Sequence, residues 1–143
     1  MRTTSLQKLS EALVKAQSEI KHAMKDSNNS HFKNDYASLE SVINASKEAL
    51  LKQDIIVLQG MNQDGSALVT RLLHKSGEFI ETDTKIILSK QDMQGLGSAI
   101  TYARRYALAA ILNISQADDD GNEASKPATA SKGKTKPKVS DDF

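Results

Sequence analysis

The chain has 143 residues, no cysteine and no tryptophan, and its 19 basic and 18 acidic side chains give a formal net charge of +1. This length suits one modest domain with a tail, and the lack of cysteine excludes disulfides, cysteine-ligated zinc and thiol chemistry. No apolar run approaches the roughly 20 residues that cross a bilayer, and residues 1–5 lack the apolar core of a signal peptide, so we expect a cytoplasmic protein.

The first half of the domain is predicted to be mainly helical. Residues 4–24 carry apolar side chains every three or four positions, and Thr4 and Gln7 have the spacing of a capping box. The narrow apolar stripe favours packing on the chain's own domain over packing on a neighbouring subunit. A polar loop is expected over residues 25–35, and a second helix over about 38–53.

Strand signals begin after residue 54. The β-branched segment 55–59 is followed by the turn residues 62–65, whose Asp-Gly pair favours a hairpin. Residues 66–74 and 78–88 supply two more strands, and between them Gly77 provides the positive φ of a turn. These patterns predict an antiparallel three-stranded meander.

A long helix is predicted from an N-cap at Ser89 to about residue 114, with a break near Gly95 and Gly97. Its apolar stripe faces a core, while Tyr102, Arg104, Arg105 and Tyr106 lie on or beside another side. An unpaired guanidinium is costly to bury, so we expect this side to meet something anionic or aromatic. Nucleic acid meets both needs through its phosphates and bases; the alternative is an ordinary solvated face. A glycine inside a helix is unfavourable, so the two glycines predict a close approach of backbone, ligand or partner.

Four segments, in order, resemble the ERF (essential recombination function) family of phage single-strand annealing proteins. Residues 94–108 resemble the signature helix of this family. Residues 29–39 resemble its Asn-x-x-Phe-x-x-x-Tyr-x-x-Leu motif. Residues 68–78 resemble its Thr-x-Leu-x-His-x-Ser-Gly-Glu strand and turn. Residues 118–121 resemble the acidic segment that follows its long helix. The four together are specific, although each one alone is weak.

The resemblance implies ATP-independent binding of single-stranded DNA and annealing of complementary strands in phage recombination, in the bacterial host cytoplasm. It implies a homo-oligomer, either a ring or a filament, because many copies of a small domain are needed for a continuous groove. The chain has no phosphate-cradling Gly-x-x-x-x-Gly-Lys loop, and we expect no cofactor and no covalent chemistry. The expected fold class is α+β: two N-terminal helices, the meander, and the long helix packed on the sheet.

The predicted DNA-binding residues are mostly on the long helix. Arg105 and then Arg104 are the strongest candidates for phosphate contacts, and of the two tyrosines one is expected to belong to the core or an interface. The loop residue Lys33 and the strand residues Arg71 and His74 are further candidates, although a lone histidine is more often structural. The complete set is Arg105, Arg104, Lys33, Tyr102, Tyr106, Thr101, Ser98, Gln94, Arg71 and His74.

Residues 1–123 are expected to form the annealing domain and residues 124–143 a disordered tail. Five of the 19 basic residues and two of the 18 acidic ones lie in this tail, which leaves 14 basic and 16 acidic residues in the domain. A DNA site must therefore be a local patch rather than a global positive field. The tail ends in Asp141, Asp142 and Phe143, which resemble the acidic-aromatic tip of bacterial single-stranded-DNA-binding proteins and imply a contact with replication or repair proteins.

Two other functions fit parts of the sequence. Asp118, Asp119 and Asp120 could bind the metal of a metal-dependent nuclease, but the sequence shows no recognisable set of further acidic residues to join them. A solvent-exposed segment that ends the long helix is the simpler interpretation. Alternatively, the helix with Arg104 and Arg105 could dock an acidic partner protein, as a non-enzymatic interaction module.

Overall fold

The computed structural model describes residues 1–24, 27–29 and 34–115 of the chain. The predicted tail, the three aspartates that begin at residue 118 and the loop residue Lys33 lie outside this part. The elements in chain order are α1 (Gln7–Gln17), β1 (Ser27–Asn29), β2 (Asn34–Tyr36), α2 (Leu39–Lys52), β3 (Ile55–Met61), β4 (Ala67–His74), β5 (Phe79–Lys85) and α3 (Met93–Leu112).

The main sheet is the predicted antiparallel meander, with strand order β3-β4-β5. Val57 pairs with Leu72, and Leu72 pairs with Ile80, so these three side chains lie on one face of the sheet. The first hairpin turns at Gly65 and the second at Gly77, and both glycines have positive φ values, of 74° and 93°. The turn chemistry read from the sequence is confirmed.

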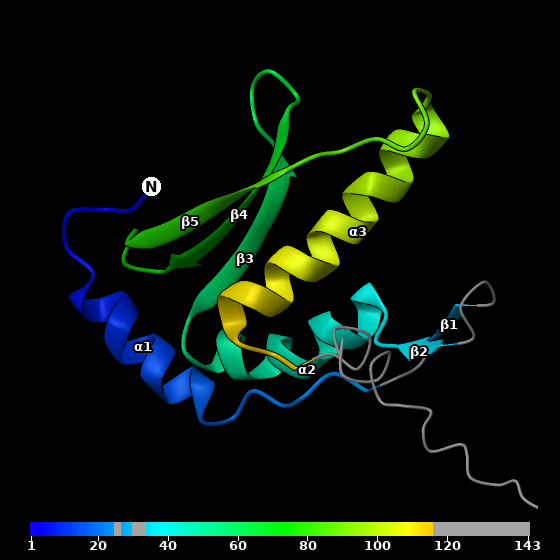
Figure 1. Ribbon diagram of the computed structural model, residues 1–143. Coiled ribbons are helices and arrows are strands. Elements are labelled where there is room, and N and C mark those ends of the chain that lie inside the picture. Colours follow the sequence, from blue (N-terminus) through cyan, green and yellow to red (C-terminus); the bar gives the residue numbers. More distant parts are fainter. Residues whose placement is uncertain (25–26, 30–33, 116–143) are drawn as a thin grey trace, which may run out of the picture.

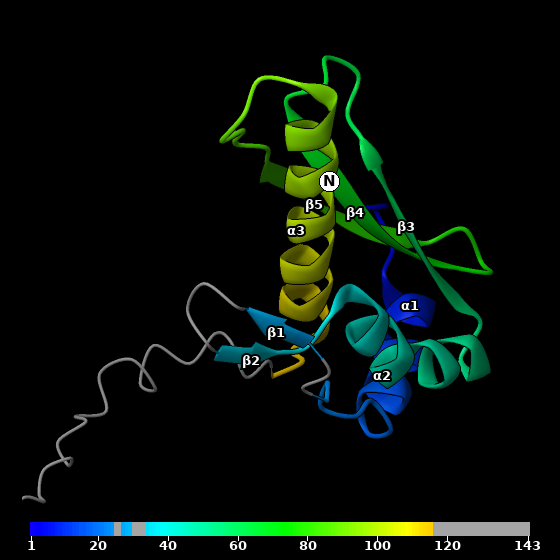
Figure 2. The ribbon, with the colours of Figure 1, turned by 90° about the vertical axis from the view of Figure 1, so that its right-hand side faces the viewer.

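All three helices cover one face of this sheet, which we call the inner face (Figures 1 and 2). The core is made of side chains from α1, α2, the inner face and the second half of α3, and Leu9, Val42, Ile55 and Leu112 are almost wholly buried in it. A smaller cluster beneath the middle of α3 joins Leu68 to Ala103 and Ala107. The α+β architecture, with a long helix packed across the sheet, is therefore confirmed.

The two edges of the sheet differ. Residues 1–3 run beside β5, where Arg2 forms a bridge to Ile80 and the amide of Thr3 donates to the carbonyl of Phe79 over 3.0 Å. Within the described residues, β3 pairs with β4 alone. One edge of the meander is thus covered by the chain itself, whereas no described segment pairs with the edge at β3.

Helix α1 is shorter than predicted and begins without a local cap. It starts at Gln7 rather than residue 4 and ends at Gln17 rather than residue 24, and Leu6 at its N-cap position provides no side-chain hydrogen bond. Instead, the carboxylate of Glu78 in the β4–β5 turn accepts the amide of Leu9 over 2.8 Å. The predicted capping box was wrong, because a distant carboxylate satisfies this helix terminus.

Helix α3 begins at a different residue from the predicted Ser89. Asp92 is the N-cap, and its carboxylate accepts the amide of Gly95 over 2.7 Å. The helix then runs unbroken through both glycines to Asn113, which ends it in the left-handed conformation with φ of 58°. A Cβ on Gly95 would lie 2.2 Å from the carbonyl oxygen of Lys90, whereas one on Gly97 would meet no atom within 4 Å. Only Gly95 fulfils the predicted close approach within the chain.

The loop predicted before α2 contains a short hairpin of β1 and β2, with Asn29 paired to Asn34. Its asparagines and serine have low strand propensity, so the pattern gave no strand signal. Ser38, which follows β2, caps α2 by accepting the amide of Ser41 over 3.1 Å.

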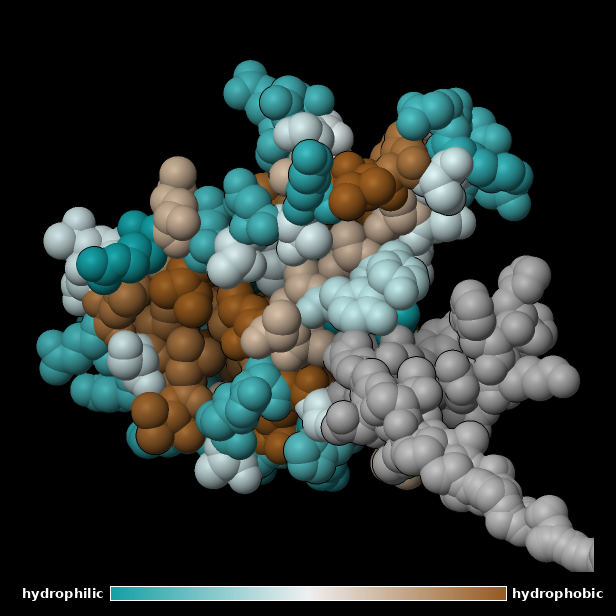
Figure 3. Space-filling view, in the orientation of Figure 1, coloured by the Kyte–Doolittle hydropathy of each residue, from teal (hydrophilic) through white to brown (hydrophobic). Residues whose placement is uncertain are grey.

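Polar and apolar side chains are segregated on the face seen in Figure 3. Apolar side chains gather on its left half, between α1 and α3, and the strongly polar ones lie over the upper loops and along the lower edge. In the part of the chain that the structure describes, no helix is long and apolar enough to cross a membrane.

Candidate nucleic-acid interface

Four of the predicted residues lie along one exposed face of α3, which we call the polar face. Their spacing of four, three and one residues brings them to the same side of the helix, and each is solvent-exposed. Tyr102 is the largest of them, with 57% of its surface exposed. The four are Gln94, Ser98, Thr101 and Tyr102.

Tyr102 is held in a compact group with the second tyrosine and Arg105. The two rings are 4.7 Å apart between centroids, and the two hydroxyls are 3.2 Å apart. The guanidinium carbon of Arg105 lies 5.0 Å from the ring centroid of Tyr102 and 4.7 Å from that of Tyr106. A cation at this distance from a ring face is attracted to it, so Arg105 restrains both rings.

Arg105 itself is buried, with only 6% of its surface exposed. Its Nη1 donates to the carbonyl oxygen of Ala37 over 3.4 Å, which ties the middle of α3 to the segment between β2 and α2. A guanidinium packed in this way is compensated by ring faces and a carbonyl dipole, which is what a buried charge requires. The expectation that a helix would leave both adjacent arginines exposed does not hold for Arg105.

Arg104 projects to the other side of the helix, towards β3. Its Nε donates to Oε1 of Gln59 over 3.3 Å, and Nε2 of Gln59 donates back to the carbonyl of Arg104 over 3.1 Å. Gln59 also donates to the hydroxyl of Thr70 over 2.9 Å, so this one amide links β3, β4 and α3. Arg104 and Arg105 are therefore neighbours in sequence that serve opposite flanks of α3.

Two predicted residues on the strand β4 lie away from this helix. Arg71 is on the outer face of the sheet, where its Nε pairs with Glu81 over 2.7 Å and its guanidinium lies 3.9 Å from the ring centroid of Phe79. His74 is buried at the end of β4, and its Nδ1 is 2.8 Å from the hydroxyl of Ser76 in the turn. Neither residue shares a surface with the polar face of α3.

Several predicted residues lie outside the described part of the chain, namely Lys33, Asp141, Asp142 and Phe143. The same is true of Asp118, Asp119 and Asp120, so the alternative nuclease site has no geometry here. Among the described residues, no group of three or more histidine or acidic side chains is placed to hold a metal ion.

Two residues that anchor the arginine side chains were not among the predicted site residues. Gln59 lies between Val57 and Met61 at an inward-facing position of β3. The sequence signal is a polar residue at a position where the strand alternation calls for an apolar one. Glu81 is the direct cross-strand partner of Arg71, and the register of the second hairpin would have identified this opposite-charge pair.

Comparison with known proteins identifies the family. The sequence matches the family described as the ERF superfamily over residues 9–142, which is nearly the whole chain. Among curated proteins and solved structures, no match was found. The family is one of phage recombination and strand annealing, and its members are generally not catalysts. The four sequence segments and the extent of this match agree, and the chain belongs to the ERF superfamily.

Proposed function

We propose that this protein binds single-stranded DNA through the polar face of α3 and anneals complementary strands without ATP, as an oligomer in the bacterial cytoplasm. The observation that carries the proposal is an exposed aromatic ring, Tyr102, on a helix within the residues that match a family of recombination proteins. Annealing needs a protein that holds a strand and leaves the hydrogen-bonding edges of its bases available.

Stacking on Tyr102 meets that requirement. A base that stacks uses its face, so its Watson–Crick edge remains open to a complementary strand. Gln94, Ser98 and Thr101 offer uncharged polar groups along the same side of the helix, and such groups contact the sugar and phosphate without reading sequence. Tyr106 is only partly exposed, so we assign Tyr102 rather than Tyr106 to the base contact.

Arg105 acts in this proposal as a positioning residue. Its guanidinium lies within 5.0 Å of both ring centroids and is bonded to the backbone at Ala37, so the ring of Tyr102 is presented in a fixed orientation. A ring that is ordered before DNA arrives loses less conformational entropy when a base stacks on it. Direct contact of Arg105 with phosphate is not required.

Phosphate attraction comes from cations beyond the polar face. Arg104 flanks α3, and we assign supporting phosphate contacts to Arg104, to Lys33 and to the five lysines of the tail. Because each neutralised phosphate releases counterions, binding should weaken steeply with salt. An oligomer supplies many copies of this weak site along one strand, which raises the overall affinity.

The test compares wild type with Tyr102→Ala and Tyr102→Phe. Fluorescence anisotropy with a labelled single-stranded oligonucleotide measures binding, and two complementary oligonucleotides without ATP measure annealing across a salt series. Loss of one stacking contact is worth about 1–3 kcal/mol, so Tyr102→Ala should bind about 5- to 150-fold more weakly and anneal more slowly. Tyr102→Phe keeps the ring and should stay close to wild type.

Tyr102 is largely exposed, so its replacement by alanine leaves the core intact, which circular dichroism verifies. If wild type neither binds single strands nor accelerates annealing, the proposed function is wrong. If wild type does both and Tyr102→Ala is unchanged, the function stands and the polar face of α3 is not its DNA site.

A further inference from the structure

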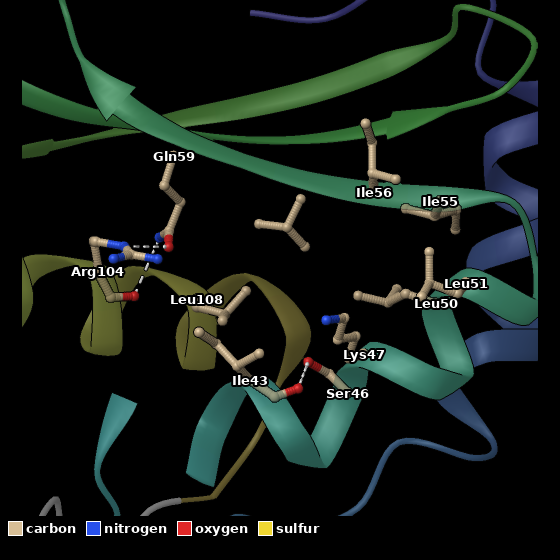
Figure 4. Close-up of a pocket in the computed structure, with 11 residues that line it drawn as sticks. Ile43, Ser46, Lys47, Leu50, Leu51, Ile55, Ile56, Gln59, Arg104 and Leu108 are labelled. Carbon is tan, nitrogen blue, oxygen red and sulfur yellow. Dashed lines mark hydrogen bonds between the residues drawn. The ribbon is translucent and has the colours of Figure 1, made fainter. Parts of the chain in front are cut away.

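A cavity opens between α2, β3 and the second half of α3, outside the polar face (Figure 4). Its volume is about 270 Å³, which exceeds the cavity of about 150 Å³ that holds a benzene ring in an engineered protein core. Most of its wall is apolar, so it would receive a hydrophobic side chain. The apolar lining residues are Ile43, Leu50, Leu51, Ile55, Ile56, Val57 and Leu108.

Two cations line this cavity, and neither has a carboxylate partner among the described residues. The ion pairs of the described residues are Lys52 with Glu19, Arg71 with Glu81, and Lys75 with Asp54, and they include neither Lys47 nor Arg104. Lys47 extends beneath β3 with its amino group directed towards α3, and the Nε of Arg104 reaches only the amide oxygen of Gln59 (Figure 4). An apolar cavity with two uncompensated cations favours an occupant that is both aromatic and acidic.

The cavity also reaches the uncovered edge of the sheet. Ile56 points to the opposite face of β3 from Ile55 (Figure 4). Strand alternation puts Val57 on the face of Ile55, so a cavity lined by all three extends around the edge of the strand. Ile56 and Leu58 are 45% and 46% exposed there. An edge strand beside a pocket receives an extended peptide, whose backbone pairs with the strand while its side chains fill the pocket.

We propose that this cavity binds the tip of the same chain, residues 139–143, with the sequence Val-Ser-Asp-Asp-Phe. The ring of Phe143 enters the apolar cavity, and Asp141 and Asp142 pair with Lys47 and, when no DNA phosphate is bound there, with Arg104. The segment then lies in extended form along β3 and covers the edge that β4 leaves open. A tip held here is withheld from any second protein.

The connecting chain is long enough for this contact. Leu108 lines the cavity and precedes Leu112, where α3 ends, by four residues or roughly 6 Å of helix. The 23 residues between Ser115 and Val139 span roughly 27 Å if they behave as a flexible coil, and more when extended. The tip can therefore reach the cavity of its own chain without strain.

The test is fluorine NMR on the full chain labelled with 4-fluorophenylalanine. The chain has three phenylalanines, and Phe143→Leu identifies the resonance of the tip. In wild type this resonance should be displaced from its position in denaturant, because the ring is packed. In Lys47→Glu it should return to the denatured position. In Lys15→Glu, which makes the same charge change on the exposed surface of α1, it should stay displaced.

A second variant, Asp141→Asn with Asp142→Asn, alters only the tip and should also release the ring, so the result does not depend on the stability of a variant in α2. The proposal is overturned if the wild-type resonance coincides with its denatured position. It is also overturned if neither variant moves a displaced resonance, or if dilution abolishes the displacement, which would identify a neighbouring copy as the source of the tip.

Discussion

The burial of Arg105 makes it a residue on which folding stability depends. Replacement by alanine removes a cation from two tyrosine faces, at 5.0 and 4.7 Å, and a hydrogen bond to the carbonyl of Ala37. Each cation–π contact contributes about 0.5–2 kcal/mol, and the hydrogen bond about 1 kcal/mol. We therefore expect Arg105→Ala to lower the free energy of unfolding by about 2–5 kcal/mol, and the melting temperature by roughly 10–25 °C.

The measurement is urea unfolding followed by circular dichroism, with Arg104→Ala as the matched control. Arg104 carries the same charge at the next position, but its side chain is only half-buried, and its one side-chain hydrogen bond among the described residues is to Gln59 over 3.3 Å. Its replacement should cost less than about 1 kcal/mol. The reasoning is refuted if the two variants lose equal stability, or if Arg105→Ala stays within about 0.5 kcal/mol of wild type.

Three further predictions concern other parts of the fold. Glu78→Ala should lower the free energy of unfolding by about 0.5–2 kcal/mol because α1 loses the carboxylate that accepts the amide of Leu9, and Glu78→Gln should lose less, as measured by urea unfolding. Gly95→Ala should be destabilising because its Cβ would meet a backbone oxygen at 2.2 Å, whereas Gly97→Ala should be neutral or stabilising by up to about 1 kcal/mol; equal effects in thermal melts would contradict this contrast. The hydroxyl of Ser66, and to a lesser extent its amide, lower the pKa of Asp64 in the folded state. The stabilisation from this carboxylate is therefore present above its unfolded pKa and is lost as the pH falls through its folded pKa. An NMR titration of Ser66→Ala should show that the pKa of Asp64 rises.

The elements that local patterns specify were predicted well. Alternation and turn residues located β3, β4 and β5, and helical periodicity located α2 and α3, because each of these signals resides within a dozen residues of sequence. The start of α1 was missed because its cap, Glu78, lies 69 residues from Leu9. No local rule connects two positions that far apart.

The sequence did not predict how the side chains of the candidate site are oriented. Gln94, Ser98, Thr101 and Tyr102 were candidates from the segment that resembles the family, and the structure places them on one exposed side of α3. The burial of Arg105 depends on two rings and a carbonyl that the fold assembles around it, so charge alone favoured exposure. The positions of Lys33 and of the tip residues stay predictions.

The contact between Glu78 and α1 has a consequence for the order in which the chain folds. During synthesis α1 emerges first, but the carboxylate that accepts the amide of Leu9 belongs to a turn that follows β4. Closing a loop of this length costs chain entropy, so α1 gains its cap only after the second hairpin has formed. The first helix in sequence is thus among the last to be fixed, and its amides should exchange with solvent before those of the central strand.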